Sequence, residues 1–343
     1  MSRCDQANST LFLRGLHISP PIALAPMVGL SHSALRSLVA ERGGVGLFFT
    51  EMLTARRLPH DNPFCSPLLV KSSGERPLFY QLVTAEPAEI RPAVDRIHQL
   101  EGQGIDLNLG CPAPMIRKQG AGLALLDDRR RLQAVVSALR KCTELPVSVK
   151  IRLGKVGDTK ALKNLCLFLE GEGVDLITIH ARLDEEKFCR HPRWSTVAEV
   201  RPGISVPLLL NGGIFSVEDA RRSLAITGAA GLMIGRGAVR CPGLLTDIAT
   251  ELFGWTQDEV TPSSKDNFFS FFHLLETRFA PERRLGRLKQ FTAYFAEPLF
   301  FGHQLSSAVQ ASKSMAEAGE RAELYFSHEF AKQEETDHHD RAD

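Results

Sequence analysis

The chain has 343 residues, 43% of them hydrophobic and 24% charged, and its formal net charge is +1. That length can bury a barrel-sized core with a smaller domain beside it, and the small net charge excludes a strongly basic or acidic molecule. No apolar run approaches the roughly 20 residues that span a bilayer, and the first residues lack the apolar stretch of a signal peptide, so we expect a cytoplasmic protein without membrane contact.

Eight short apolar segments recur through the first two-thirds of the chain and have the composition of buried β-strands. They are residues 22–27, 47–52, 78–83, 105–109, 147–152, 176–181, 207–211 and 231–235. Between them lie segments with apolar residues at helical spacing, such as residues 128–140 and residues 216–224, the latter opening with a serine cap.

Strands that alternate with helices in this way predict an α/β fold, a (β/α)8 TIM barrel over residues 16–250. A doubly wound open sheet is the alternative, but it calls for a Gly-x-Gly-x-x-Gly turn that does not follow the first strand. After about residue 266 the patterns are helical, and we expect a small α-helical domain over residues 262–330. Residues 1–15 are expected to form an N-terminal tail, and the charged residues 331–343 a disordered one.

Functional side chains in a parallel barrel project from the carboxyl ends of its strands. Here almost every predicted strand ends in a residue of one ring, most of whose members are polar. Such a ring favours a large ligand that makes many polar contacts. Its members are Met27, Glu51, Gln81, Asn108, Cys111, Lys150, Arg152, His180, Arg182, Asn211, Gly235 and Arg236.

Glycine-rich corners follow the seventh and eighth predicted strands, at residues 211–214 and 234–237. Glycines let backbone N–H groups approach a phosphate closely, and these two strands form the usual phosphate corner of such barrels. With Arg236 beside them, they predict a phosphate site; the alternative is a pair of simple turns with helix caps.

Lys150 ends an apolar strand and therefore needs an anionic partner. It is interpreted as a Schiff-base lysine, as the charge partner of a reduced flavin, or as half of an ion pair with Glu51 or Asp106. His180 is interpreted as a general acid, a ligand or a core histidine with its hydrogen bonds satisfied. Arg182, two residues later, leaves the strand on the same side, and this favours a functional role for His180.

Cys111 is one of seven cysteines, an odd number without a Cys-x-x-Cys pair. That pattern disfavours a disulfide framework, an iron–sulfur cluster or a structural zinc site, and no second His or carboxylate lies at metal spacing, so we expect no metal. Free cysteines are usually buried fillers, but Cys111 lies in a turn between Gly110 and Pro112. There its thiol can serve as a proton donor or as a nucleophile.

Together these stretches resemble the tRNA-dihydrouridine synthase family. The most specific match is Asn108-Leu-Gly-Cys111-Pro112 with the Gly-Ala-Gly sequence at residues 120–122 downstream. The matching stretches, in the family's order, are residues 25–27, 50–52, 81–82, 106–112, 120–122, 149–152, 179–182, 211–214 and 234–237. The Arg193-Trp194 pair departs from the family, in which many members have Asp-Trp at this place.

The resemblance implies a barrel that binds flavin mononucleotide (FMN), takes electrons from NADPH and is followed by a helical domain that holds tRNA. It implies reduction of specific uridines to 5,6-dihydrouridine, with hydride passing from flavin N5 to uracil C6 and a proton from Cys111 to C5. A thiol of ordinary pKa, near ~8.5, stays mostly protonated at neutral pH, as a proton donor must. We expect a monomer.

The resemblance also assigns residues to the two ligands. Around FMN it places Pro26, Met27, Val28, Gln81, Lys150, His180, Asn211, Gly212, Gly213, Gly235 and Arg236. Near the target base or its backbone it places Asn108, Arg152 and Arg182. Arg287 and Lys289, in a basic helical stretch, are expected to contact tRNA phosphates, or else to form an ordinary solvated helix face.

Three other functions remain open on the sequence. One is a flavin barrel that acts on a free pyrimidine, as dihydroorotate and dihydropyrimidine dehydrogenases do. A second is a Schiff-base lyase that uses Lys150, and a third is an RNA-binding protein built on an inactive barrel. The extra helical domain and its arginines favour the tRNA enzyme.

Overall fold

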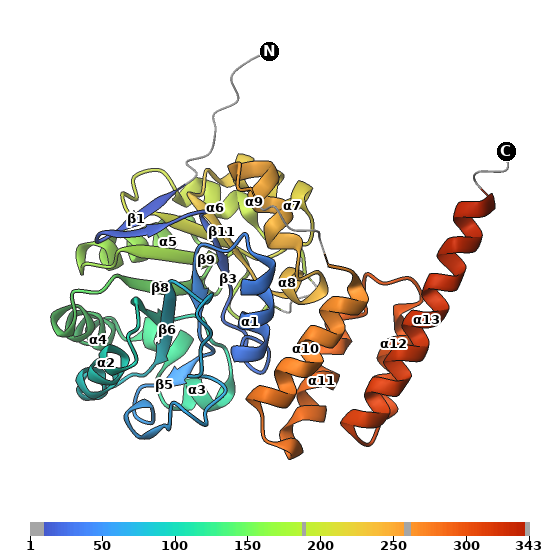
Figure 1. The fold of residues 1–343 in the computed structure, drawn as a ribbon. Coiled ribbons are helices and arrows are strands. Elements are labelled where there is room, and N and C mark those ends of the chain that lie inside the picture. The colour runs from blue at the N-terminus through green and yellow to red at the C-terminus, as the bar shows by residue number, and fades with distance from the viewer. Residues whose placement is uncertain (1–9, 187–189, 257–261, 340–343) are drawn as a thin grey trace, which may run out of the picture.

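The computed structural model describes residues 10–186, 190–256 and 262–339, with backbone only from residue 328 onward. Its centre is a parallel barrel surrounded by helices, and a separate group of helices lies at one side (Figure 1). The sheet runs in the order β3-β11-β10-β9-β8-β7-β6-β4, and Leu24 of β3 closes it by donating its N–H to the Leu47 carbonyl at 3.0 Å. The TIM barrel predicted from the sequence is therefore confirmed.

All eight predicted segments contribute a strand to this barrel. The strands are β3 (Ile22–Leu24), β4 (Phe48–Phe49), β6 (Leu78–Val83), β7 (Gly104–Asn108), β8 (Val147–Arg152), β9 (Leu176–His180), β10 (Leu208–Asn211) and β11 (Gly231–Ile234). The short β5 (Leu53–Thr54) follows β4 and also pairs with β6. These strands are almost wholly buried, which explains their continuous apolar runs.

The barrel interior changes from apolar to polar along the strands. On β8, Val147, Val149 and Ile151 belong to the large core shared with the helices, so Ser148, Lys150 and Arg152 point inward. A second buried cluster fills the amino-terminal end of the interior and includes Phe49, Phe79, Leu176, Leu209 and Met233. The inward residues become polar towards the carboxyl ends, and this polar layer forms the candidate site.

A hairpin closes the amino-terminal end of the barrel. It consists of β1 (Leu11–Leu13) and β2 (Leu16–Ile18), joined by a turn in which Arg14 and Gly15 have positive φ. Leu11, Leu13 and Ile18 pack into the interior cluster. The predicted N-terminal tail over residues 1–15 is thus wrong for residues 11–15, because strands of three residues leave almost no periodicity in a sequence; residues 1–9 lie outside the described part.

Helices pack around the barrel. They are α1 (Ser33–Arg42), α2 (Ile90–Gln99), α4 (Arg129–Cys142), α5 (Thr159–Gly171), α6 (Trp194–Val200), α7 (Val217–Thr227), α8 (Arg236–Arg240) and α9 (Leu244–Phe253). Four shorter turns lie in the loops: η1 (Leu58–His60), η2 (Pro87–Glu89), α3 (Pro114–Lys118) and η3 (Gly122–Asp127). The serine cap predicted for α7 is present, since Ser216 accepts the Asp219 N–H.

In the described residues, four helices follow the barrel: α10 (Ser264–Arg278), α11 (Pro281–Phe295), α12 (Gly302–Ala311) and α13 (Met315–His339). Phenylalanines form their core, with Phe271 and Phe291 stacked at a centroid distance of 3.8 Å. The helix α13 continues to His339, over most of the segment for which a disordered tail was predicted; residues 340–343 lie outside the described part. None of the described helices combines the length and apolar character that crossing a membrane requires.

Candidate active site

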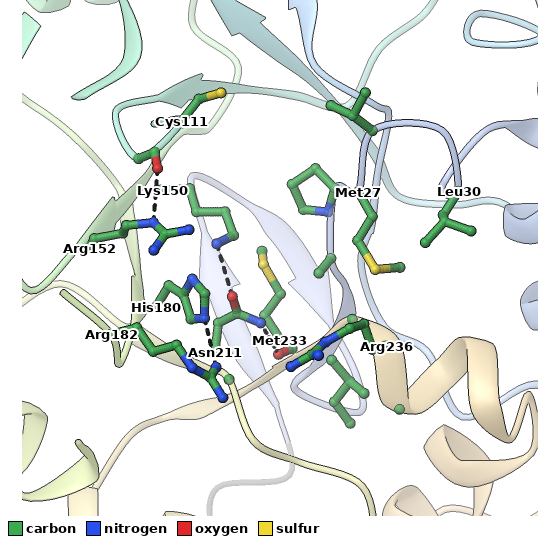
Figure 2. A pocket seen from close by; sticks show the side chains of 18 of the residues that line it. Met27, Leu30, Cys111, Lys150, Arg152, His180, Arg182, Asn211, Met233 and Arg236 are labelled. Atoms are coloured by element: carbon green, nitrogen blue, oxygen red, sulfur yellow. Dashed lines mark hydrogen bonds between the residues drawn. The ribbon is translucent and has the colours of Figure 1, made fainter. Parts of the chain in front are cut away.

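A cavity of about 340 Å³ opens where the carboxyl ends of the strands meet. It brings together the predicted site residues of the barrel: Pro26, Met27, Val28, Gln81, Asn108, Cys111, Lys150, Arg152, His180, Arg182, Asn211, Gly212, Gly213, Gly235 and Arg236. Figure 2 shows Cys111, Arg152 and Arg182 along one side and Met27 and Leu30 along the opposite side. No carboxylate is among the described residues that line it.

A chain of hydrogen bonds connects the floor of the cavity to the Cys111 turn. Asp106 accepts from the Gln81 Nε2 at 2.7 Å and from the Ser148 hydroxyl at 2.6 Å. Gln81 Oε1 accepts from the Asn108 Nδ2 at 2.9 Å, and Asn108 Oδ1 accepts the Cys111 N–H at 2.9 Å. Complete burial raises the pKa of Asp106 to about 6, an effect that these donors and Lys150 oppose.

Lys150 is bonded to an amide rather than to a carboxylate. Its Nζ donates to Asn211 Oδ1 at 2.9 Å, while the Asn211 Nδ2 donates to the Met233 carbonyl at 2.7 Å. Burial, together with the nearby Arg152 charge, lowers the pKa of Lys150 to about 8, against the influence of Asp106. The alternative of a direct ion pair with Glu51 or Asp106 is not observed: Glu51 accepts the Gly29 N–H at 2.7 Å, and Asp106 accepts from Gln81 and Ser148. The Lys150 ammonium therefore faces the cavity, and none of the described residues forms a direct ion pair with it.

His180 is neutral and has a defined tautomer. Burial holds its pKa well below the usual range, and the cations Lys150, Arg152, Arg182 and Arg236 add to the effect. Its Nε2 lies 3.0 Å from the Arg182 Nη1. Because an arginine can only donate, Nε2 is the acceptor and the proton resides on Nδ1. The same four cations make the cavity attractive to an anion.

Two of these cations are anchored to loop carbonyls. Arg152 donates from Nε to the Gly110 carbonyl at 3.1 Å and from Nη1 to the Leu183 carbonyl at 3.0 Å. Arg182 donates from Nε and Nη2 to the Arg190 carbonyl at 3.0 and 2.7 Å. Both guanidiniums are thereby fixed at the rim, and Arg152 also holds the turn that carries Cys111.

The glycine corner requires residues without a side chain. Gly212 has a φ of +110°, and a Cβ there would lie 2.8 Å from the His180 Cδ2. Gly213 has a φ of +78°, and its Cβ would lie 2.4 Å from the Pro192 Cγ. Trp194 fixes this corner by donating its indole N–H to the Gly212 carbonyl at 3.1 Å. The Trp of the divergent Arg193-Trp194 pair therefore has a structural partner in the site.

Arg287 and Lys289 do not line the cavity. Arg287 lies where α11 meets the loop after β3, and its Nη1 donates to the Gly29 carbonyl and to the Gln290 Oε1, both at 3.1 Å. Gly29 has a φ of +83°, and a Cβ there would lie 2.4 Å from the Gln290 Nε2. We call this contact between α11 and residues 26–32 the seam. Its position makes Arg287 a link between the helices and the loop that carries Met27.

Other residues line the cavity without having been predicted. Met52 and Met233 add thioethers, and Phe215 lies at the rim with the Arg236 guanidinium 5.5 Å from its ring centre. Tyr294 is the one described lining residue that comes from the C-terminal helices. Met233 could have been predicted from the sequence, because alternate residues of β11 point into the barrel. Tyr294 could not, because it reaches the site only where α11 packs against the barrel. No cluster of three His, Cys, Asp or Glu in the described part could hold a metal ion.

A family model and several similar curated proteins point to the same family. The family model described as dihydrouridine synthase matches residues 23–324. A probable tRNA-dihydrouridine synthase from Rhodobacter capsulatus is 32% identical over 77% of this chain and 82% of its own length. A tRNA-dihydrouridine(16) synthase from Aquipseudomonas alcaligenes is 33% identical over 79% of this chain and 89% of its own length.

Longer and more distant matches agree with these. A probable tRNA-dihydrouridine synthase from Mycobacterium tuberculosis is 28% identical over 92% of this chain and 84% of its own. Among solved structures, a 2-naphthoyl-CoA reductase complex matches with a TM-score of 0.54 and 11% identity, over 71% of this chain and 52% of that one. This last likeness shows the fold alone.

Proposed function

The chain belongs to the dihydrouridine synthase family of oxidoreductases, and on that basis we propose that it reduces specific uridines of tRNA to 5,6-dihydrouridine with a bound FMN. One cavity combines a cation cluster, a glycine corner and a thiol, and this combination supports the proposal. The protein would act in the cytoplasm, where its substrate is found.

The cavity fits the chemical character of FMN. Lys150, Arg152, Arg182 and Arg236 face it, and no described lining residue opposes them with a negative charge, so an anionic ligand is favoured. Gly212 and Gly213 line the cavity and carry no side chain, so their backbone N–H groups are accessible to a phosphate. The thioethers of Met27, Met52 and Met233 suit contact with a flat aromatic ring.

When bound, the flavin supplies to uracil C6 the hydride that it has taken from NADPH. On our proposal the chain's own residues prepare the base for this addition. Arg152 and Arg182, fixed by loop carbonyls, orient the base or its backbone, and Asn108 lies beside them. The Lys150 ammonium would stabilise negative charge on bound FMN, and the neutral His180 would donate its Nδ1 proton to an acceptor of that cofactor.

Cys111 is the proposed catalytic residue. Addition of hydride at C6 leaves enolate character across C5 and O4, and the Cys111 thiol gives its proton to C5 as the new C–H bond forms. The resulting thiolate recovers a proton from solvent, which reaches it because Cys111 is only partly buried. In Figure 2 its sulfur projects from the loop that follows β7.

The helices α10–α13 would hold tRNA while the target base leaves its stack to enter the cavity. Lys289 remains a proposed phosphate contact. For Arg287 the bond to Gly29 supports a different role, in the seam.

The decisive experiment supplies the purified protein with NADPH and unmodified tRNA and maps dihydrouridine by mass spectrometry. We expect a yellow protein with flavin absorbance and dihydrouridine at defined positions only. Free uracil serves as the comparison substrate. Reduction of free uracil with tRNA left untouched would identify the free-pyrimidine enzyme instead.

A further inference from the structure

Asp106 lies beneath the cavity and does not line it. It is fully buried on β7, two residues before Asn108 and five before Cys111. The described groups around it are Gln81 of β6, which bonds to its Oδ2, and Ser148 of β8, which bonds to its Oδ1. The charged group that acts on it is Lys150, also of β8. A buried carboxylate that touches no ligand requires a structural reason.

The hydrogen bonds from Asp106 to Cys111 have one consistent direction. A carboxylate can only accept, so Gln81 presents its Nε2 to Asp106 and its Oε1 to Asn108. Asn108 must then present its Nδ2 to Gln81 and its Oδ1 to the turn. That oxygen accepts the N–H groups of Gly110 at 3.1 Å and Cys111 at 2.9 Å. Reversing either amide would place two donors against each other.

The geometry points to Asp106 as a positioning residue that, as an obligate hydrogen-bond acceptor, sets the two amides and through them the turn that carries the Cys111 thiol. This inference rests on the proposed function, in which Cys111 delivers a proton to uracil C5. The carboxylate acts through Gln81 and Asn108, and it touches neither substrate nor cofactor.

Substitutions separate this acceptor role from a role of the charge. Asp106→Leu removes the acceptor, and we expect kcat to fall about 10²-fold with flavin content retained, because a misplaced catalytic group costs about that much. Asp106→Asn also removes the charge, but its Oδ1 can accept from Gln81 while its Nδ2 donates to Ser148. We therefore expect the kcat of Asp106→Asn to lie within about threefold of the wild-type value, in contrast to that of Asp106→Leu.

Ser148 provides the matched control. Ser148→Ala leaves Asp106 able to accept from Gln81, so kcat should stay near the wild-type value. In the double variant Asp106→Asn/Ser148→Ala, the introduced amide loses the partner that orients it, and we expect most of the rescue to disappear. If Asp106→Leu fails to fold, the comparison of kcat between Asp106→Asn and this double variant tests the acceptor role instead.

A second readout does not depend on turnover. The rate at which iodoacetamide alkylates Cys111, followed by peptide mass spectrometry, should rise several-fold in Asp106→Leu and stay unchanged in Asp106→Asn. The exposed Cys65 and Cys241 are internal standards in the same molecule.

The outcomes separate the alternatives. Equal losses in Asp106→Asn and Asp106→Leu would overturn the acceptor role in favour of charge, and wild-type behaviour of Asp106→Leu would overturn any positioning role. A wild-type protein that leaves tRNA unreduced refutes the proposed function, whereas the alkylation rates still test the position of the turn.

Discussion

The barrel mouth and the seam use arginines in opposite ways. At the mouth, Arg152 and Arg182 donate hydrogen bonds to loop carbonyls, and their charged guanidinium groups remain beside an open cavity. In the seam, Arg287 donates to Gly29 and Gln290, and its charge acts on the buried Glu51 and His32. A residue at the carboxyl end of a barrel strand is directed by the strand, whereas a residue on a helix is directed by the surface on which the helix packs.

This contrast separates chemistry from assembly. If it is correct, substitutions at the mouth change cofactor binding or turnover and leave folding nearly intact. Substitutions of Arg287 and His32, the seam residues that do not line the cavity, change stability and leave the chemical step alone. Predictions at both places test this division.

The largest effect should come from Cys111→Ala at the mouth. Loss of a general acid lowers kcat by roughly 10²- to 10⁴-fold, while flavin absorbance and the free energy of unfolding should hardly change. Dihydrouridine in tRNA, quantified by mass spectrometry, measures the effect. The exposed Cys65 is the matched control, and Cys65→Ala should behave as the wild type. Retention of full turnover by Cys111→Ala would remove the thiol from the mechanism.

Lys150→Met should weaken flavin binding by roughly 30-fold, about 2 kcal/mol, because it removes a buried cation that faces the ligand. Fluorescence titration of the flavin-free protein measures the Kd. Lys155 is a suitable control, since it pairs with Asp127 on the surface at 2.8 Å, and Lys155→Met should bind flavin normally.

The pH dependence of the same titration identifies the responsible group. The pKa of Lys150 is about 8, so in the flavin-free protein its charge is lost as the pH rises through that value. Flavin affinity of the wild type should therefore decline above pH 8, and that of Lys150→Met should not. Parallel profiles for the two proteins would show that another group controls binding.

In the seam, His32 should make stability depend on pH. Burial lowers its pKa to about 3, with smaller contributions from Arg287 and Arg36. Between that value and about 6.5 the unfolded chain binds the proton and the folded one does not, so stability falls as the pH drops through this window. The loss reaches about 2 kcal/mol at about pH 5. Urea denaturation at neutral pH and at that lower pH measures it.

His32→Phe should abolish this difference. Both ring nitrogens of His32 lack a hydrogen-bond partner among the described residues, and its ring packs edge-on against Phe279 at 4.7 Å, so a phenyl group suits the site. The exposed His273 is the control, since His273→Phe should keep the wild-type pH dependence. An unchanged pH dependence in His32→Phe would assign the acid sensitivity elsewhere.

The sequence predicted the barrel mouth much better than the seam, for a physical reason. Each strand of the barrel is an apolar run buried on both faces, and parallel order then gathers all carboxyl ends at one rim. Lys150, His180 and Cys111 could therefore be placed together from their positions in the chain. The hydrogen bonds of Asp106 required coordinates, because several partners were possible for one buried carboxylate.

The C-terminal helices could be recognised but not docked. A helical pattern indicates that a helix exists and which residues are apolar, and it does not indicate which part of another domain the helix contacts. Arg287 was therefore interpreted as a phosphate contact, and Tyr294 was not detected at all. The hairpin of β1 and β2 was missed for another reason, since its strands have three residues each.

Arg287→Ala gives the smallest and most discriminating effect. A hydrogen bond from a charged, half-buried donor in the seam is worth about 1.5 kcal/mol of stability, and we expect a loss of that size. The salt dependence of tRNA binding should remain unchanged, whereas loss of a phosphate contact would lower the slope of log K against log[salt] by about 0.9. Lys289→Ala is the comparison on the same helix and should lower that slope with little effect on stability. A reduced slope in Arg287→Ala would show that one arginine serves both tRNA binding and assembly, and the division between mouth and seam would no longer hold.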